Sequence, residues 1–385
     1  MPTTTLSRGT ITVVPASIQQ IPGLGGDTSI FTMIILYLPF LFFLFYGQKF
    51  QMQMAMFEIN GHLKQLNKMR NFAKNQTLTT LSKAGAKIED AKKGLELMLN
   101  YFTILPESMD PAGIVAKVEH ILDVRDDKLI REVKTLVPDL SDPDARNLEN
   151  LVEATAALEQ IYKILRHFFL LGKKTGNVYL IIQLQMIMSL VMIEARAYLS
   201  AIHAFRNGQP IGDGIGALVA STMIGGAETT EIAKETAVAE SKFEGRKLLI
   251  VKAVGPGGNT GKPGEAVKKL IEKNKKKVKL IVMVDAALKL EGEDLGDIAE
   301  GVGAAIGGIG VDKFKIEEQA SEYQIPLHAV IIKQSLANAV SLMKKEIYDS
   351  VEEVIDRIRR IVRDNTKKRQ TVIIAGIGNS IGIAQ

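Results

Sequence analysis

The sequence predicts a chain of the α + α/β class, with an N-terminal transmembrane helix, a central helical bundle and a C-terminal α/β sandwich. Three observations support this prediction: an uncharged apolar run near the N-terminus, helical spacing of apolar residues through the middle, and short Ile/Val runs alternating with helices after Phe243. The predicted divisions are an extracytoplasmic leader (1–28), the transmembrane helix (29–46), a helical cytoplasmic domain (47–240) and an α/β ligand-binding domain (243–385).

The predicted membrane anchor reads SIFTMIILYLPFLFFLFY over residues 29–46 and carries no charge. Eighteen residues are near the lower length limit for a helix that crosses a bilayer. Pro39 interrupts the run, but membrane helices tolerate proline better than soluble helices do. A cleavable signal peptide would have a basic first region and a small-residue cleavage site. The sequence offers neither, so we expect an uncleaved anchor.

Basic residues predominate directly after this run. Lys and Arg accumulate on the cytoplasmic side of membrane proteins, so we expect the N-terminus outside, the bulk of the chain in the cytoplasm, and a single-pass protein of the cell membrane. The basic residues are Lys49, Lys64, Lys68, Arg70 and Lys74, against Glu58 alone.

The amino-acid composition limits the kinds of partner and of chemical site that the chain can have. The net charge is +5, and the charged residues, 24% of the chain, are interspersed, which suits an anionic membrane surface better than nucleic acid. We therefore expect the lipid bilayer, and no nucleic acid, among the partners. The chain has no cysteine, which excludes disulfides, thiolate metal sites and a cysteine nucleophile.

Apolar residues recur at helical spacing from Gln48 to about Asn100, which predicts that the membrane helix continues into the cytoplasm. Asp110-Pro111 is expected to start another helix, and a further helix is expected over about 145–171.

Residues 178–193 are almost entirely apolar. Gln183 and Gln185 interrupt them and Glu194 follows, so the uncharged length falls short of a typical membrane span. We interpret this segment as the central helix of a soluble bundle, wrapped by the other helices. The alternative is a second membrane span, which would place the C-terminal half outside.

The C-terminal region reads as a mainly parallel sheet of about four strands covered by helices on both faces, because continuous Ile/Val runs alternate with helical patterns. The predicted strands are 247–254, 278–284, 327–332 and 371–375. The predicted helices are 228–240, which bridges from the bundle, and 264–277, 294–306, 315–323 and 336–362.

A glycine-rich segment, GPGGNTGKPGEAV, follows the first predicted strand. Glycine turns present backbone N–H groups to anions, so we expect a phosphate- or carboxylate-binding loop. It is not a Walker A loop, because five residues separate Gly255 from Gly261 and Pro263 replaces the magnesium-binding Ser or Thr. A tight turn before a proline-started helix is the alternative. The candidate ligand residues are Gly255, Gly257, Gly258, Asn259, Thr260 and Lys262.

Asp285 follows the second predicted strand, with Glu291 and Glu293 a few residues on. Carboxylates at a strand end could hold Mg²⁺, the cation that such oxygen ligands suit. Glu293 also fits the acidic start of a helix, which is the alternative reading. These three acids are the candidate metal ligands.

The terminal segment GIGNSIGI follows the last predicted strand and leaves no room for the helix of a dinucleotide-binding fingerprint. We expect Gly376, Gly378 and Asn379 to form a loop facing the same ligand. No catalytic residue can be assigned, because the histidines lack metal-ligand spacing and no nucleophile–base pattern is evident.

Several strings resemble an uncharacterised archaeal membrane protein family, a domain of unknown function that spans nearly the whole chain. The resemblance implies an archaeal cell membrane and brings no activity, substrate or catalytic residue. The strings are KKTGN (173–177), QLQM (183–186), PIGDGIG (210–216), GKPGEAV (261–267), VDAALKLEGE (284–293) and GIGN (376–379), together with the N-terminal span.

The leading functional hypothesis is a membrane-anchored cytoplasmic protein whose α/β domain binds a phosphorylated small molecule or nucleotide. One alternative is a metal-assisted hydrolase or transferase centred on Asp285. The other is a membrane-associated scaffold that forms homo-oligomers through its helical region.

Overall fold

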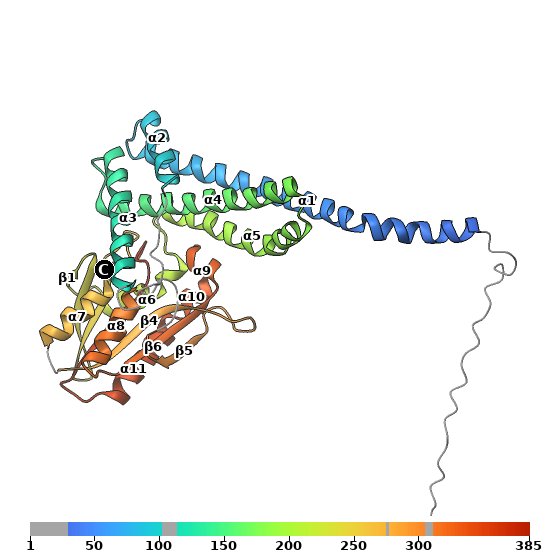
Figure 1. The fold of residues 1–385 in the computed structure, drawn as a ribbon. Helices are drawn as coiled ribbons and strands as arrows, with labels where there is room; N and C mark the ends of the chain where they lie inside the picture. The colour runs from blue at the N-terminus through green and yellow to red at the C-terminus, as the bar shows by residue number, and fades with distance from the viewer. Residues whose placement is uncertain (1–29, 102–113, 275–276, 305–310) are drawn as a thin grey trace, which may run out of the picture. The chain divides into compact units, whose positions relative to one another are not determined.

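The computed structural model describes residues 30–101, 114–274, 277–304 and 311–385 (Figure 1). The predicted leader therefore lies outside the described residues. A single helix, α1, runs over Ile30–Lys83, which confirms that helix continues beyond Tyr46. Residues from Met56 onward form one compact unit.

Within the described residues, four further helices make up the helical region; the helix predicted over 145–171 is present, the pattern predicted from 48 to 100 is broken after Lys83, and the predicted helix start at Asp110-Pro111 lies outside the described residues. The four helices are α2 (Ile88–Leu99), α3 (Ile114–Leu136), α4 (Asp142–Thr175) and α5 (Val178–Asn207). The α4–α5 hairpin turns at Gly176, which adopts a left-handed conformation that suits glycine. Asn177 then caps α5 by accepting a hydrogen bond from the backbone N–H of Leu180.

Over residues 178–193, helix α5 is covered on one face by the described part of the chain. Ile181, Leu184 and Met188 are buried on its inner side, whereas large apolar side chains on its outer side are exposed. The prediction that other helices wrap α5 is therefore wrong. Among the described residues, α5 is the one helix long and apolar enough to cross a membrane by length and composition, and 28% of its most apolar window is buried.

A short helical turn, η1 (Gly212–Gly214), and α6 (Ile215–Ile224) lead into a mixed seven-stranded sheet. The strand order is β1-β2-β3-β7-β4-β6-β5. The four central strands are parallel, and the remaining strands pair antiparallel at the edges. The strands are β1 (Thr229–Ala233), β2 (Thr236–Phe243), β3 (Arg246–Ala253), β4 (Val278–Leu288), β5 (Ile298–Val302), β6 (Leu327–Gln334) and β7 (Thr371–Gly376).

The four central strands correspond to the four predicted ones, and the three edge strands correct the prediction. Residues 228–240, predicted as a helix, instead form β1 and part of β2, and β2 pairs along its whole length with β3. Residues 298–302, also predicted as helical, form β5 against β6. In both segments, pairing with the sheet overrides the local helical pattern. The edge of a sheet presents unpaired backbone N–H and C=O groups, and these segments pair with them as strands.

The predicted helix over 336–362 is broken into α9 (Leu336–Val340), α10 (Lys345–Asp349) and α11 (Val351–Asn365). The break has a tertiary cause. The backbone N–H of Gly212 donates to the carbonyl of Ser341, and that of Met343 donates to Pro210. These bonds hold residues 341–343 extended beside the chain that enters η1.

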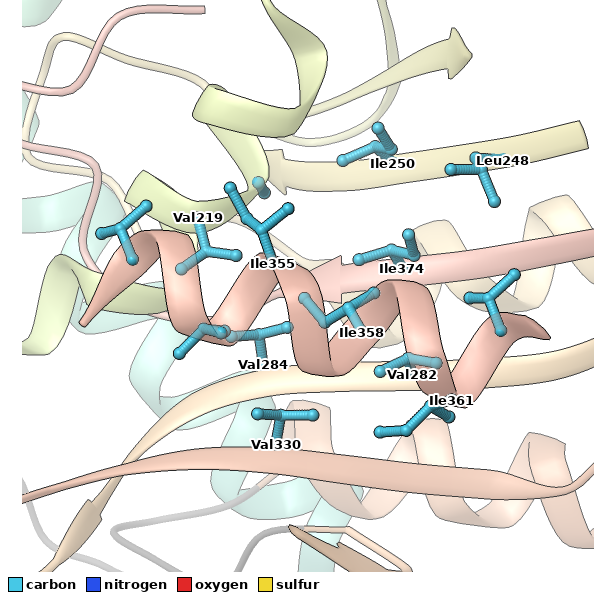
Figure 2. Packing of buried hydrophobic residues seen from close by; sticks show 14 of the residues in the cluster. Val219, Leu248, Ile250, Val282, Val284, Val330, Ile355, Ile358, Ile361 and Ile374 are labelled. Carbon is cyan, nitrogen blue, oxygen red and sulfur yellow. The ribbon is translucent and has the colours of Figure 1, made fainter. Parts of the chain in front are cut away.

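Helices cover both faces of the sheet. On one face, α6 and α11 pack on alternate strand residues; Figure 2 shows Ile355 and Ile358 of α11 among the side chains of Ile250, Ile374 and Val282. On the other face lie α7 (Pro263–Asn274) and α8 (Val311–Glu322), the latter close to its predicted position. Two buried faces explain the continuous Ile/Val runs of the central strands.

Candidate functional site

The candidate site lies beyond the carboxyl ends of the parallel strands. The connections from β3 to β4 and from β4 to β6 place α7 and α8 on one face, whereas α11, between β6 and β7, covers the other face. The chain runs from β3 past the position of β7 to β4 and on to β5 at the edge, and then returns through β6 to β7, so that β7 lies between β3 and β4. Ligands of open α/β sheets bind outside the carboxyl ends of the parallel strands.

Asp285, near the end of β4, is 2% exposed. Its carboxylate pairs with the ammonium group of Lys313, in the first turn of α8, and accepts a hydrogen bond of 2.8 Å from the backbone N–H of Ala286. Burial raises the pKa of Asp285 to about 6, although the charge of Lys313 acts in the opposite direction. The side chain therefore changes charge just below neutral pH.

A second carboxylate, Asp213 in η1, completes the group. Its Oδ2 accepts a hydrogen bond of 3.0 Å from the backbone N–H of Asn379, and burial raises its pKa. Its charge interacts with those of Lys313 and Asp285. We call Asp213, Asp285, Lys313 and Asn379 the strand-end cluster. It places two carboxylates and one lysine together toward the carboxyl ends of the strands.

Glycines allow the backbone segments of this cluster to approach one another. A Cβ atom on Gly216 would meet the carbonyl oxygens of Ile377 and Val284, and one on Gly378 would meet the carbonyl of Asp213. Gly378 also has a φ of 126°, a conformation that favours glycine. The backbone of residues 210–216 (PIGDGIG) therefore packs closely against that of residues 376–379 (GIGN) beside the end of β4.

The predicted phosphate loop is held by protein partners. The backbone N–H of Gly258 donates to Oδ1 of Asn147 at 2.9 Å, and Asn150 donates to the Gly258 carbonyl at 2.8 Å. Ser380 Oγ lies 2.8 Å from the carbonyl oxygens of both Val254 and Gly257. The hydrogen bonds of Ser380 thus connect the two predicted ligand loops, residues 255–262 and the segment that begins at Gly376. The alternative interpretation of this segment, a tight turn before a helix, accounts for the buried glycines, because neighbouring atoms leave little room for a side chain at these positions.

The outer side of this loop borders two cavities. One, of about 390 Å³, is lined in part by Gly255, Gly257 and Asn259; the other, of about 230 Å³, is lined in part by Thr260 and Lys262. Both also contain Arg146 and Glu235, which form an ion pair with each other. The cavities lie between the α/β domain and helices α3 and α4.

Lys262 points to α3. Its Nζ lies 2.5 Å from an oxygen of Asp123 and 3.5 Å from Glu119, and Glu119 also pairs with Lys315 at 2.6 Å. These acids raise the pKa of Lys262 despite its burial. An anion that used Lys262 would have to compete with the two carboxylates of α3.

The three predicted metal ligands have separate surroundings. Glu293 accepts a hydrogen bond of 2.6 Å from the backbone N–H of Leu290 and lies 3.3 Å from Nζ of Lys333. Glu291 is exposed, whereas Asp285 pairs with Lys313. Within the described ranges, no group of three or more His, Asp or Glu side chains could hold a metal ion. Asp213 and Asp285 are the two carboxylates whose charges interact at the strand ends.

Asp213, Lys313 and Lys252 are not among the site residues that the sequence predicts. The glycines around Asp213 mark that residue in the sequence, but nothing near Lys313 distinguishes it from Lys315, the other lysine of α8. Lys252 is fully buried in β3, where its Nζ donates to the carbonyl of Ala253 at 2.9 Å and to the side chain of Gln385 at 3.2 Å. Burial lowers its pKa to about 8.

Comparisons with known proteins match nearly the whole chain to one family. Residues 33–208 match the model described as "Protein of unknown function (DUF1512) N-terminal domain", and residues 211–384 match "Domain of unknown function (DUF1512) C-terminal". No curated protein matches the chain significantly.

Proposed function

This chain belongs to the DUF1512 family, and we propose that it is a membrane-tethered protein whose cytoplasmic α/β domain binds a phosphorylated small molecule or nucleotide at the strand-end cluster. The observation that supports this most is the buried pair of Asp285 and Lys313 beside Asp213, toward the carboxyl ends of the parallel strands. Burying these charges is costly in folding free energy, and functional sites are where such costs are commonly retained.

The cluster suits a phosphorylated ligand that carries Mg²⁺. Mg²⁺ is usually bound through one or two carboxylates and the phosphates of the ligand. Asp213 and Asp285 would supply the carboxylates, and Lys313, released from its pair with Asp285, would supply a positive charge to a phosphate. The Gly376–Asn379 segment would line the same site.

The experiment is a thermal-shift and calorimetric titration of the purified chain with ATP, ADP and inorganic phosphate, each with and without Mg²⁺. A ligand at 100 times its dissociation constant stabilises the native state by about 2.7 kcal/mol. We expect a magnesium-dependent rise in melting temperature that Asp285→Asn abolishes and Glu291→Gln, at an exposed position, retains. The absence of any shift at millimolar concentrations of these ligands would refute the proposal.

A hydrolase or transferase centred on Asp285 is the second candidate. A carboxylate with a pKa of about 6 is suited to proton transfer near neutral pH. In this case Asp285→Asn would remove turnover of the bound nucleotide while leaving most of the affinity. Equal losses of binding and turnover would favour the binding role instead.

The proposed tether is residues 29–46, with the N-terminus outside the cell membrane and the bulk of the chain in the cytoplasm. The support is the uncharged sequence of that run and the basic residues after it. Because the chain has no cysteine, single cysteines report topology cleanly. In intact cells, an impermeant maleimide should label Thr3→Cys and leave Leu336→Cys unlabelled until lysis. The reverse pattern would overturn this topology.

A further inference from the structure

The α/β domain gathers positive charge at one end of its sheet. The segments that lead into β3, β7 and β4 (242–247, 363–369 and 272–279) contain twelve Lys and Arg residues and three Asp and Glu residues. The other residues of 211–385 contain fourteen basic and twenty-one acidic ones. Because these strands are parallel neighbours, the three segments meet at their amino ends. We call the exposed basic residues there the amino-end patch: Lys242, Lys273, Lys277, Lys279, Lys367, Lys368 and Arg369.

A buried arginine helps to fix the shape of the patch. Arg246, which is 7% exposed, donates from Nη2 to the carbonyl oxygen of Thr366 at 2.7 Å and from Nε to the hydroxyl oxygen of the same residue at 2.8 Å. The backbone N–H of Arg369 donates to the carbonyl of Gly245 at 2.7 Å, and β4 joins them through its pairing with β7. The three segments are thus bonded to one another, so the basic side chains extend from an ordered backbone.

The patch carries charges that the fold itself does not neutralise. Within the described part of the chain, none of its seven residues forms an ion pair. The charge of Lys368 acts on Glu244, but that carboxylate lies 2.7 Å from Arg363. Arg369 also has a φ of 69°, a left-handed conformation that is uncommon for residues other than glycine. Like charges held close together destabilise a fold, so these side chains indicate a partner with closely spaced negative charges.

An aromatic side chain borders the patch. A cavity of about 390 Å³ is lined by Lys279 of the patch, by Tyr323, which follows α8, and by the apolar residues Ile271, Val278 and Ile325. Tyr323 is 45% exposed. Proteins that bind single-stranded nucleic acid combine positive charge along the phosphate backbone with aromatic rings on which bases stack. A lipid surface would supply negative charge but no base for the tyrosine ring.

We infer that the amino-end patch and Tyr323 bind a single-stranded nucleic acid, with phosphates on the basic side chains and one base against the tyrosine ring. The position of the patch leaves it accessible, because α3 and α4 contact the opposite edge of the sheet, at the carboxyl ends of the strands. Along the sequence the basic residues are interspersed, which predicts no nucleic-acid partner. The fold gathers three separate segments of them in one surface, and this reverses that expectation.

Fluorescence anisotropy of labelled oligouridine and oligothymidine, with the detergent-solubilised full chain, tests the charge of the patch. We expect binding at low salt that weakens as salt is added, since each neutralised phosphate contributes about 0.7 to the slope of log K against log salt. The double variant Lys367→Glu, Lys368→Glu should weaken binding by at least about tenfold. Lys344→Glu, Lys345→Glu makes the same change at another exposed lysine pair and should leave the affinity nearly unchanged. Equal losses in the two variants, or no binding by the natural chain, would overturn the inference.

Substitution of Tyr323 tests the stacking. Tyr323→Ala should weaken binding of the single strand by about tenfold, and Tyr323→Phe, which keeps the ring, should retain it. A duplex that binds as tightly as the single strand, or polyglutamate that displaces the oligonucleotide equally well, would show that charge alone is recognised and would overturn the proposed partner. The ratio of the two oligonucleotide affinities identifies RNA or DNA as the preferred strand. Lys367→Glu, Lys368→Glu should leave the magnesium-dependent thermal shift of the strand-end cluster unchanged, so the two proposals can fail separately.

Discussion

The ammonium group of Lys313, at the start of α8, contacts the buried carboxylate of Asp285, near the end of β4. The pair joins a helix on one face of the sheet to a central strand. It also balances part of the charge of Asp213, which would otherwise repel Asp285.

Breaking this pair should destabilise the fold. Lys313→Met leaves the carboxylate of Asp285 buried without its cation, and removing one partner of a buried pair costs about 3–5 kcal/mol. The double variant Asp285→Asn, Lys313→Met should lose clearly less than the sum of the two single losses. Chemical denaturation of the three variants measures this coupling. Additive losses would mean that the pair contributes no interaction of its own.

Stability should rise with pH through the titration range of Lys252. Its pKa is about 8 in the folded chain and about 10.4 when unfolded. Between these values the unfolded state binds more protons, so the free energy of unfolding increases with pH, by up to about 3 kcal/mol. Denaturation between pH 7.5 and 10 measures this slope. Lys252→Met, which has no titrating group, should flatten it, and a slope unchanged in that variant would assign the effect to other groups.

Gly216→Ala should be severely destabilising, by more than about 3 kcal/mol, because the added Cβ would overlap backbone carbonyls that cannot move independently of β4 and β7. Gly61→Ala is the matched control. Its Cβ would meet nothing within 4 Å in the middle of α1, so the better helix propensity of alanine should stabilise the chain by up to about 1 kcal/mol. Melting temperatures of the two variants should therefore shift in opposite directions.

Asn147→Ala should loosen the glycine loop. The change leaves the buried N–H of Gly258 without its acceptor, which costs about 1–3 kcal/mol. Hydrogen exchange should accelerate at Gly258 and its neighbours while the central strands stay protected. Asn71→Ala, at an exposed position of α1, serves as the control and should leave exchange in the loop unchanged. Unaltered exchange at Gly258 in the Asn147 variant would show that this contact does not hold the loop.

Much of the fold could be predicted because it depends on local pattern. The continuous Ile/Val runs of β3, β4, β6 and β7 report burial on both faces, and the apolar spacing in α1 and α4 reports helices. The edge strands could not be predicted in this way. Residues 229–243 carry polar and charged side chains that also suit a helix, and their pairing with β3 decides their conformation.

The candidate site, like the fold, could be predicted from the sequence only in part. Asp285 was identifiable because a carboxylate at the end of an apolar strand is unusual. Its partner Lys313 was not, because the two residues are 28 positions apart and the contact exists only once α8 packs on the sheet. The glycines at 255–258 predict an anion-binding loop, whereas their neighbours in space are residues of α4 and the terminal segment.

The sequence by itself determined the order of a helical region and an α/β domain, and the positions of the four buried strands, because hydrophobic periodicity is a property of neighbouring residues. Tertiary structure alone decided the edges of the sheet, the partners of Asp285 and the exposure of the outer face of α5. Each of these depends on which distant segments exclude water from a residue, and contacts of that kind leave little trace in local sequence.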